Sequence, residues 1–235
     1  MIVAAIKIAV VISWTSLFSI LALLGLPFNK RGRLFNWLGM HWARGILRIC
    51  GVKLEVDGID NLDFSSNYIY VSNHASMFDI PAVMGYIPDQ IRMVVKKELV
   101  GIPLFGWAVR TGGYIIIDRG HGLEAMRSLE KAAETIRRGA SVHLFAEGTR
   151  TKTGKLQPFK RGAFNLAVRA GVPIVPLTIN GSYKILPKTK FRITPGTIQL
   201  KLSKPIPTTG WDGKKGETKL MEQVQAVIQQ HYVDQ

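Results

Sequence analysis

After Gly51 the sequence alternates between short apolar runs and amphipathic segments, and this alternation constrains the fold more than any other feature. The apolar runs predict strands at Lys53–Val56, Tyr68–Val71, Arg92–Val95, Tyr114–Ile117, Val142–Ala146 and Ile174–Ile179. The amphipathic segments predict helices at Phe78–Gly85, Pro103–Arg110, Leu123–Arg138, Arg161–Ala170 and Glu217–Tyr232. Uniformly apolar strands separated by helices predict an α/β fold, in which helices flank a mostly parallel sheet. We expect Arg192–Leu202, interrupted by Pro195-Gly196, to form a hairpin at one edge.

The N-terminal segment carries a long apolar run. No charged residue lies between Ile8 and Asn29, and about 20 apolar residues cross a bilayer core. The run is longer than that of a signal peptide and meets Lys30, Arg31 and Arg33 in place of a cleavage site. We therefore expect a retained membrane segment, with the rest of the protein on the cytoplasmic side of the cell membrane. The sequence leaves open whether the segment spans the bilayer or lies in one leaflet.

Leu34–Ile49 reads as a second, different helix. Its apolar residues recur at helical spacing and include Trp37 and Trp42, while arginines are interspersed. Such a basic amphipathic helix suits the headgroup layer of a membrane, and a helix packed on the domain core is the alternative. The predicted organisation is a membrane-anchoring helical segment at residues 1–50, followed by an α/β domain at residues 51–235.

The net charge indicates the class of partner. The 235-residue chain carries a formal charge of +15, which indicates nucleic acid, an anionic lipid surface or a phosphate-bearing substrate. The apolar N-terminus favours membrane lipid, with no nucleic acid expected. Cys50 is the single cysteine, so no internal disulfide can form. No set of His, Cys and carboxylate residues has metal-ligand spacing, so no metal or other cofactor is expected.

Polar side chains follow four of the predicted strands. Because ligand sites in open α/β sheets lie beyond the carboxyl ends of the strands, we expect these side chains to meet at one edge. They are His74 and Asp79, then Lys96 and Lys97, then Asp118 and Arg119, and finally Glu147, Gly148, Thr149 and Arg150.

His74 and Asp79 form a candidate acid–base pair. If a helix starts near Ser76, the Asp79 carboxylate can orient the His74 imidazole and leave its other nitrogen free to accept a proton. The alternative is that Ser76 and Asp79 form a capping box and that His74 is an ordinary loop residue. There is no Gly-x-Ser-x-Gly motif, which disfavours a serine acyl-enzyme. The base would then activate a substrate hydroxyl directly.

Three further segments could bind substrate. Gly148 and Arg150 suit a close turn around an anion, and Lys160 and Arg161 open a helix whose N-terminus could hold phosphate. Solvated basic turns are the alternative for each of these segments. Val172–Pro176 is expected to be core structure that could also line an acyl-chain path.

Four blocks resemble those of the glycerolipid acyltransferases, in the order of that family. The blocks are Asn73-His74-Ala75-Ser76-Met77-Phe78-Asp79, Gly113–Arg119, Phe145–Arg150 and Val172–Pro176. The resemblance spans roughly Ile69 to Ile179. It departs in the third block, where Ala146 replaces the usual proline, and we expect a slightly altered turn without loss of activity.

The resemblance implies an acyl transfer. His74 would be the general base and Asp79 its orienting partner, and the substrates would contact Asn73, Lys97, Arg119, Glu147, Gly148, Thr149, Arg150, Lys160 and Pro176. The implied reaction moves an acyl group from acyl-CoA or an acyl-carrier protein to the sn-2 hydroxyl of the acceptor 1-acylglycerol-3-phosphate (lysophosphatidic acid), giving phosphatidic acid. The acceptor could also be glycerol-3-phosphate or another lysolipid. A hydrolase and a non-catalytic basic membrane-binding protein are the rival classes.

Overall fold

The computed structural model describes residues 2–29, 32–117, 130, 132–137, 139–190 and 192–234. Within these residues, seven strands form one sheet in the order β1-β7-β6-β2-β5-β3-β4. Neighbouring strands are parallel except β6 and β7, which are antiparallel. The strands are β1 (Val52–Asp57), β2 (Ile69–Ser72), β3 (Ile91–Lys96), β4 (Ile115–Ile117), β5 (Ser141–Phe145), β6 (Ile174–Asn180) and β7 (Gly196–Leu202). The α/β fold with a mostly parallel sheet is confirmed.

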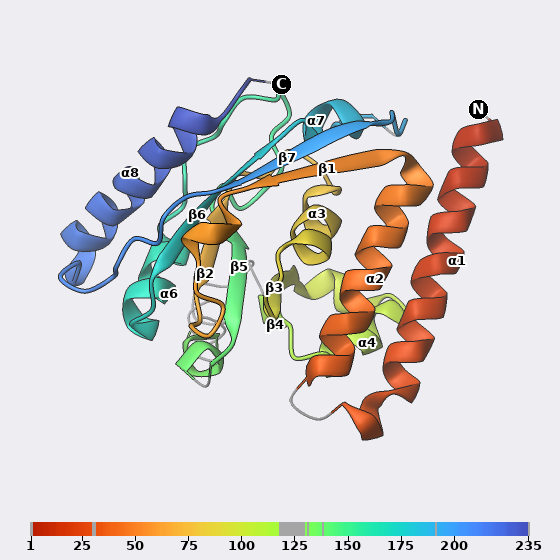
Figure 1. The fold of residues 1–235 in the computed structure, drawn as a ribbon, viewed down its shortest axis with the longest axis horizontal. Helices are drawn as coiled ribbons and strands as arrows, with labels where there is room; N and C mark the ends of the chain where they lie inside the picture. The colour runs from red at the N-terminus through yellow and green to blue at the C-terminus, as the bar shows by residue number, and fades with distance from the viewer. Residues whose placement is uncertain are drawn as a thin grey trace.

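Helices lie on both sides of the sheet (Figure 1). The inner strands β2, β5 and β6 are buried almost throughout, as expected when helices cover both faces of a sheet. The helices are α1 (Ile2–Leu24), α2 (Arg33–Cys50), α3 (Asp79–Tyr86), α4 (Phe105–Thr111), α6 (Gly162–Ala170), α7 (Ser182–Ile185) and α8 (Gly213–His231), with short 3-10 turns η1 (Leu26–Phe28), η3 (Ile59–Asn61) and η4 (Lys97–Gly101). Residues 132–137 are also helical, and the first part of the helix predicted at Leu123–Arg138 lies outside the described residues.

The hairpin predicted at Arg192–Leu202 is wrong. Residues 192–195 form no strand, because Pro195 has no N–H to donate to a ladder. β7 begins directly after it and pairs with β1 on one side and β6 on the other. β7 therefore lies inside the sheet, and β1 forms the edge. The strands that pair with β7 come from distant parts of the chain, so a local turn signal could not reveal this pairing.

α1 is tied to α2 along one flank of the molecule (Figure 1). Trp14 Nε1 donates to the Trp42 carbonyl at 3.0 Å, and Trp42 Nε1 donates to Thr15 Oγ1 at 3.1 Å. Gly45 permits this approach, because a Cβ there would lie 2.4 Å from the Trp14 ring. Within α1, Ile6–Leu24 is the one described segment long and apolar enough to cross a membrane, with mean hydropathy 2.0 and 11% of it buried. α1 is therefore a candidate membrane anchor that also packs on its own protein.

α2 packs on the domain core, as the alternative interpretation of Leu34–Ile49 expected. Ile46, Leu47 and Cys50 are buried in the same apolar cluster as strands of the sheet. Arg44 Nε donates to the Gly85 carbonyl at 2.7 Å, and its guanidinium lies over the Tyr86 ring. Protein and not lipid therefore covers this part of the apolar face of α2, whereas Trp37 on the same helix is 51% exposed.

Candidate active site

His74 and Asp79 form a hydrogen-bonded pair beyond the end of β2. His74 Nδ1 lies 2.8 Å from Asp79 Oδ2. The same oxygen accepts from the backbone N–H groups of Ala75 and Ser76, at 2.8 and 2.9 Å. A carboxylate with these donors is an acceptor, so Nδ1 carries the proton and Nε2 is the basic nitrogen. Asp79 is fully buried, whereas the His74 side chain is 14% exposed.

The local fold reconciles the two interpretations of Asp79. α3 begins at Asp79 and not near Ser76, so this carboxylate lies at the helix N-terminus and not one turn inside. From there it reaches back to Ser76 N, as in a capping box, and to His74 Nδ1 with the same oxygen. A carboxylate at a helix N-terminus is also favoured by the helix dipole. One side chain thus holds the backbone of Ala75 and Ser76, just before the helix, and orients the imidazole.

Glu147 holds the His74 loop against the loop after β5. Its Oε1 accepts from the His74 backbone N–H at 2.6 Å, and its Oε2 accepts from the Gln157 side chain at 2.7 Å and backbone at 3.2 Å. Burial raises the pKa of Glu147, and these hydrogen bonds partly oppose the rise. Ala146 donates its N–H to the Ser72 carbonyl at 2.9 Å. Proline at this position could not make this bond, so the alanine adds one hydrogen bond between the ends of β2 and β5.

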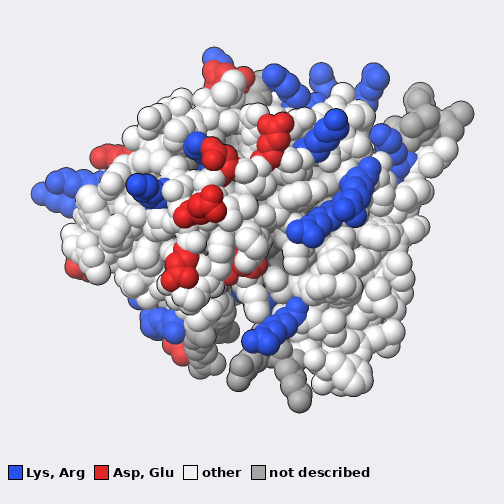
Figure 2. All heavy atoms as spheres, viewed as in Figure 1, with Lys and Arg blue, Asp and Glu red and all other residues white. Residues whose placement is uncertain are grey.

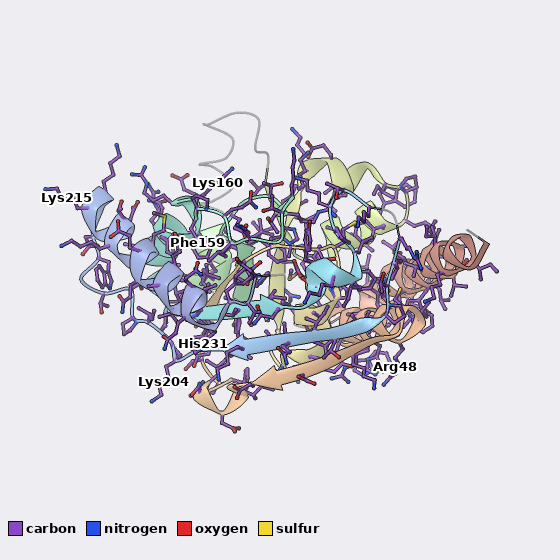
Figure 3. All side chains as sticks on the ribbon, turned by 90° about the horizontal axis from the view of Figure 1, so that it is seen from above. Arg48, Phe159, Lys160, Lys204, Lys215 and His231 are labelled. Atoms are coloured by element: carbon purple, nitrogen blue, oxygen red, sulfur yellow. The ribbon has the colours of Figure 1, made fainter. Side chains whose placement is uncertain are left out.

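The turn after Glu147 carries cations. Gly148 has φ of 71°, a conformation that favours glycine, and a Cβ there would meet the Lys160 side chain at 3.0 Å. Lys188 Nζ reaches the turn from the segment after α7, donating to Thr149 Oγ1 at 2.8 Å and towards the Arg150 carbonyl at 3.4 Å. Figure 3 shows Lys160 and Arg48 on opposite sides of the molecule. Lys160, beside this turn, is therefore far from Arg48 at the end of α2.

A cavity of about 450 Å³ adjoins His74. Most of its wall is apolar and comes from α1, α2, α3, α4 and β3, with residues such as Phe18, Leu38, Met84 and Ala108. At the site end the lining includes His74, Gly148, Thr149, Arg150, Lys188 and Lys96. The described lining contains three cationic side chains and no acidic one. Such a cavity suits an amphiphile with a long apolar tail and an anionic head.

Comparison with known proteins supports the assignment of the four blocks. Residues 53–180 match the family model described as Acyltransferase. The chain belongs to the acyltransferase family. Two curated relatives are named 1-acyl-sn-glycerol-3-phosphate acyltransferase: one from Cocos nucifera is 33% identical over 204 residues, covering 86% of this chain. The other, the alpha form from Homo sapiens, is 37% identical over 161 residues, covering 68% of this chain.

The family fold extends over nearly the whole chain. The crystal structure of the 1-acyl-sn-glycerophosphate (LPA) acyltransferase PlsC from Thermotoga maritima superposes with a TM-score of 0.85 at 25% identity, covering 98% of this chain and 93% of that one. This chain spans 65% and 57% of the lengths of the coconut and human relatives.

The structure brings together only some of the predicted site residues. His74, Gly148, Thr149 and Arg150 line the cavity together. Asn73 does not present its side chain there: it is 1% exposed, and its amide group bonds to the Ile179 backbone at both ends, each at 2.8 Å. The Asn73 side chain therefore fastens β2 to β6, and its contact with substrate stays a prediction.

The other predicted contacts have different positions. Pro176 is buried inside β6 and is not among the described residues that line the cavity. β6 is an inner strand, and its registered pairing with β7 starts only at Leu177, directly after Pro176. Lys97 begins η4, and its neighbour Lys96 is the one that lines the cavity. Arg119 lies outside the described residues.

Sequence reasoning missed three residues of the site. Phe145 stacks on the His74 ring with centroids 3.7 Å apart and planes at 13°, and although it is the first residue of the third block, no role was predicted for it. Gln157 supports Glu147, and Lys188 reaches Thr149. The last two come from loops whose path depends on the tertiary structure, so no local pattern marks them.

Proposed function

We propose that this protein transfers a fatty acyl group from an acyl thioester to the sn-2 hydroxyl of 1-acylglycerol-3-phosphate, giving phosphatidic acid. One observation carries the proposal: the His74–Asp79 pair lies where an apolar cavity meets the cationic side chains of Lys96, Arg150 and Lys188. The names of the curated relatives and of the T. maritima structure support the same reaction class.

The chemistry follows from the tautomer of His74. Nε2 accepts the proton of the acceptor hydroxyl as its oxygen attacks the thioester carbonyl carbon. The carbon–sulfur bond then breaks, and the imidazolium returns the proton to the departing thiolate. Asp79 stays ionised and stabilises the imidazolium between the two transfers. No covalent acyl-enzyme is needed, since the acceptor hydroxyl itself attacks the thioester.

Arg150 and Lys188 are the residues best placed to bind the acceptor phosphate. Arg150 can bind phosphate oxygens with paired donors. Lys188 uses two of its three N–H bonds on Thr149 and the Arg150 carbonyl, which leaves one for an anion. The apolar wall would then take an acyl chain. A donor linked to CoA and one linked to a carrier protein present the same thioester, and both are compatible with this site.

The enzyme would work at a lipid surface on which its substrates are embedded. Large apolar residues are exposed along α1 and just after it, among them Ile12 at 60%, Leu24 at 69% and Phe28 at 77%. Figure 2 shows this flank largely free of charged side chains, with a line of basic ones beside it over α2. Apolar insertion flanked by basic residues suits an anionic membrane. The cavity wall includes Phe18 and Ala22 of α1, so the acyl path runs beside the inserted helix.

The test is to incubate the purified protein in vesicles with a labelled acyl thioester and a panel of acceptors. The panel contains lysophosphatidic acid, glycerol-3-phosphate, lysophosphatidylcholine and water alone. Labelled phosphatidic acid as the main product supports the proposal. Free labelled fatty acid at the same rate with and without acceptor would indicate a hydrolase, and a different acylated product would replace the proposed acceptor.

A further inference from the structure

His143 is a buried histidine that the proposed chemistry does not use. It lies on β5 and is fully buried. Its Nε2 lies 2.9 Å from Ser72 Oγ, which itself donates to the Asn73 carbonyl at 2.9 Å. Since the single hydroxyl hydrogen of Ser72 points to Asn73, His143 Nε2 must supply the hydrogen between the two side chains. Ser72 is equally buried, so this pair has no access to substrate.

The hydrogen bonds from His143 end on the peptide that carries the catalytic base. The Asn73 carbonyl and the His74 N–H belong to one planar peptide unit. Ser72 Oγ holds the carbonyl, and Glu147 Oε1 holds the N–H at 2.6 Å. Buried side chains therefore hold both the carbonyl and the N–H of this peptide unit. His143 in turn holds Ser72, the side chain that bonds to the carbonyl.

A second route leads from His143 to the imidazole itself. The His143 ring meets Phe145 edge-on, with centroids 4.5 Å apart and planes at 86°. Phe145 in turn stacks on His74. Residues two apart on a strand point to the same face, so β5 places the His143 ring against Phe145, which in turn contacts the imidazole. Aromatic contacts of this kind fix ring orientation.

His143 is suited to positioning and not to proton transfer. Burial and the nearby His74 lower the pKa of His143 to about 3. Its Nδ1 has no hydrogen-bond partner among the described residues. A neutral imidazole that donates through Nε2 satisfies Ser72 without adding a charge beside the imidazolium that forms on His74.

We propose that His143 is a positioning residue for acyl transfer, which fixes the backbone of His74 through Ser72 and its ring through Phe145. The inference rests on the proposed function, because the residue that His143 positions, His74, is the base of that reaction. Small displacements of a catalytic group cost rate more than affinity. Loss of His143 should thus lower kcat and leave KM for both substrates almost unchanged.

The experiment compares three variants with the wild-type enzyme in the same vesicles. His143→Leu removes the donor, and we expect kcat to fall about tenfold with KM changed less than about twofold. His143→Gln restores a donor near the position of Nε2 and should recover most of kcat. Thr178→Val, a buried polar residue of β6 bonded to Ile228, is the matched control and should leave kcat unchanged. Unaltered kcat in His143→Leu, or His143→Gln as slow as His143→Leu, overturns the proposal.

Two further measurements keep this test separate from the acceptor assignment. If another acceptor of the panel is the one turned over, the variants are measured with it. Independently of turnover, ¹⁵N spectra of histidine-labelled protein should show one histidine as the neutral Nε2–H tautomer that stays neutral in mildly acidic buffer. Absence of that signal contradicts the arrangement.

A double-variant cycle tests the link between Ser72 and His143. Ser72→Ala should lower kcat as much as His143→Leu does, and the double variant should be no slower than either, because the two substitutions break one connected unit.

Discussion

His74 is held by four partners from three parts of the chain. Asp79 fixes the ring nitrogen and Phe145 the ring plane, while Glu147 and Ser72 fix the peptide. These residues converge because β2 and β5 are adjacent and parallel, so their carboxyl ends meet. A preorganised base needs no rearrangement when the acceptor hydroxyl arrives.

At this scale Lys188 offers a test of head-group recognition. Lys188→Met keeps the apolar stem and removes the charge next to Arg150. We expect KM for lysophosphatidic acid to rise about tenfold or more, the effect of a lost hydrogen bond between charged groups. An uncharged acceptor such as a monoacylglycerol should be affected far less. Lys190→Met, an exposed lysine of the same segment, is the control, and an equal effect of both substitutions would contradict the assignment.

His143 also predicts a pH dependence of stability. Its pKa is about 3 in the folded protein and 6.5 ordinarily. Between these values the unfolded chain binds the proton and the folded protein does not, so the free energy of unfolding falls as pH decreases, by up to about 1.4 kcal/mol per pH unit. Chemical denaturation at pH 7 and pH 5 should show a smaller loss for His143→Gln than for wild type. Equal losses in the two proteins would argue against a buried neutral His143.

Sequence patterns predicted the residues whose position follows from a strand end. His74, Gly148 and Arg150 follow predicted strands, and a parallel sheet alone brings them together. A substrate contact is predicted for Asn73 because the sequence cannot show that its side-chain amide bonds to the Ile179 backbone. Lys188 was missed because only the path after α7 brings it to Thr149.

At the scale of elements, strand positions were predictable and the context of α2 was not. Apolar runs mark strands that are buried in a sheet. Each of the six predicted strands is present within a residue or two of its predicted bounds. The amphipathic pattern of α2 is the same whether its apolar face meets lipid or protein. Only the contacts of Ile46 and Leu47 with the sheet distinguish the two.

This distinction can be tested by substitution in α2. Leu47 is fully buried, whereas Trp37 is 51% exposed. Leu47→Ala should lower the free energy of unfolding by about 2–5 kcal/mol, and Trp37→Ala should change it by about 0.5 kcal/mol or less. Denaturation in a mild detergent provides the measurement. If both substitutions had small effects, α2 would not be part of the domain core.

At the scale of the whole molecule, one flank combines the candidate anchor with the cavity wall. α1 contacts α2 and α4, contributes Phe18 and Ala22 to the cavity and exposes apolar side chains on its outer side. The net charge of +15 would favour anionic lipid around this flank and anionic substrates at the site. Membrane attachment and substrate entry are thus proposed to share one surface.

The most direct test of the central claim compares acyl transfer by the wild-type protein and by His74→Ala in the same vesicles. The account predicts formation of phosphatidic acid from labelled thioester and lysophosphatidic acid by the wild type. In His74→Ala the rate should fall by about 10²–10⁴-fold, the usual contribution of a general base, while vesicle binding is unchanged. Transfer by His74→Ala at the wild-type rate would contradict the assignment of His74 as the base.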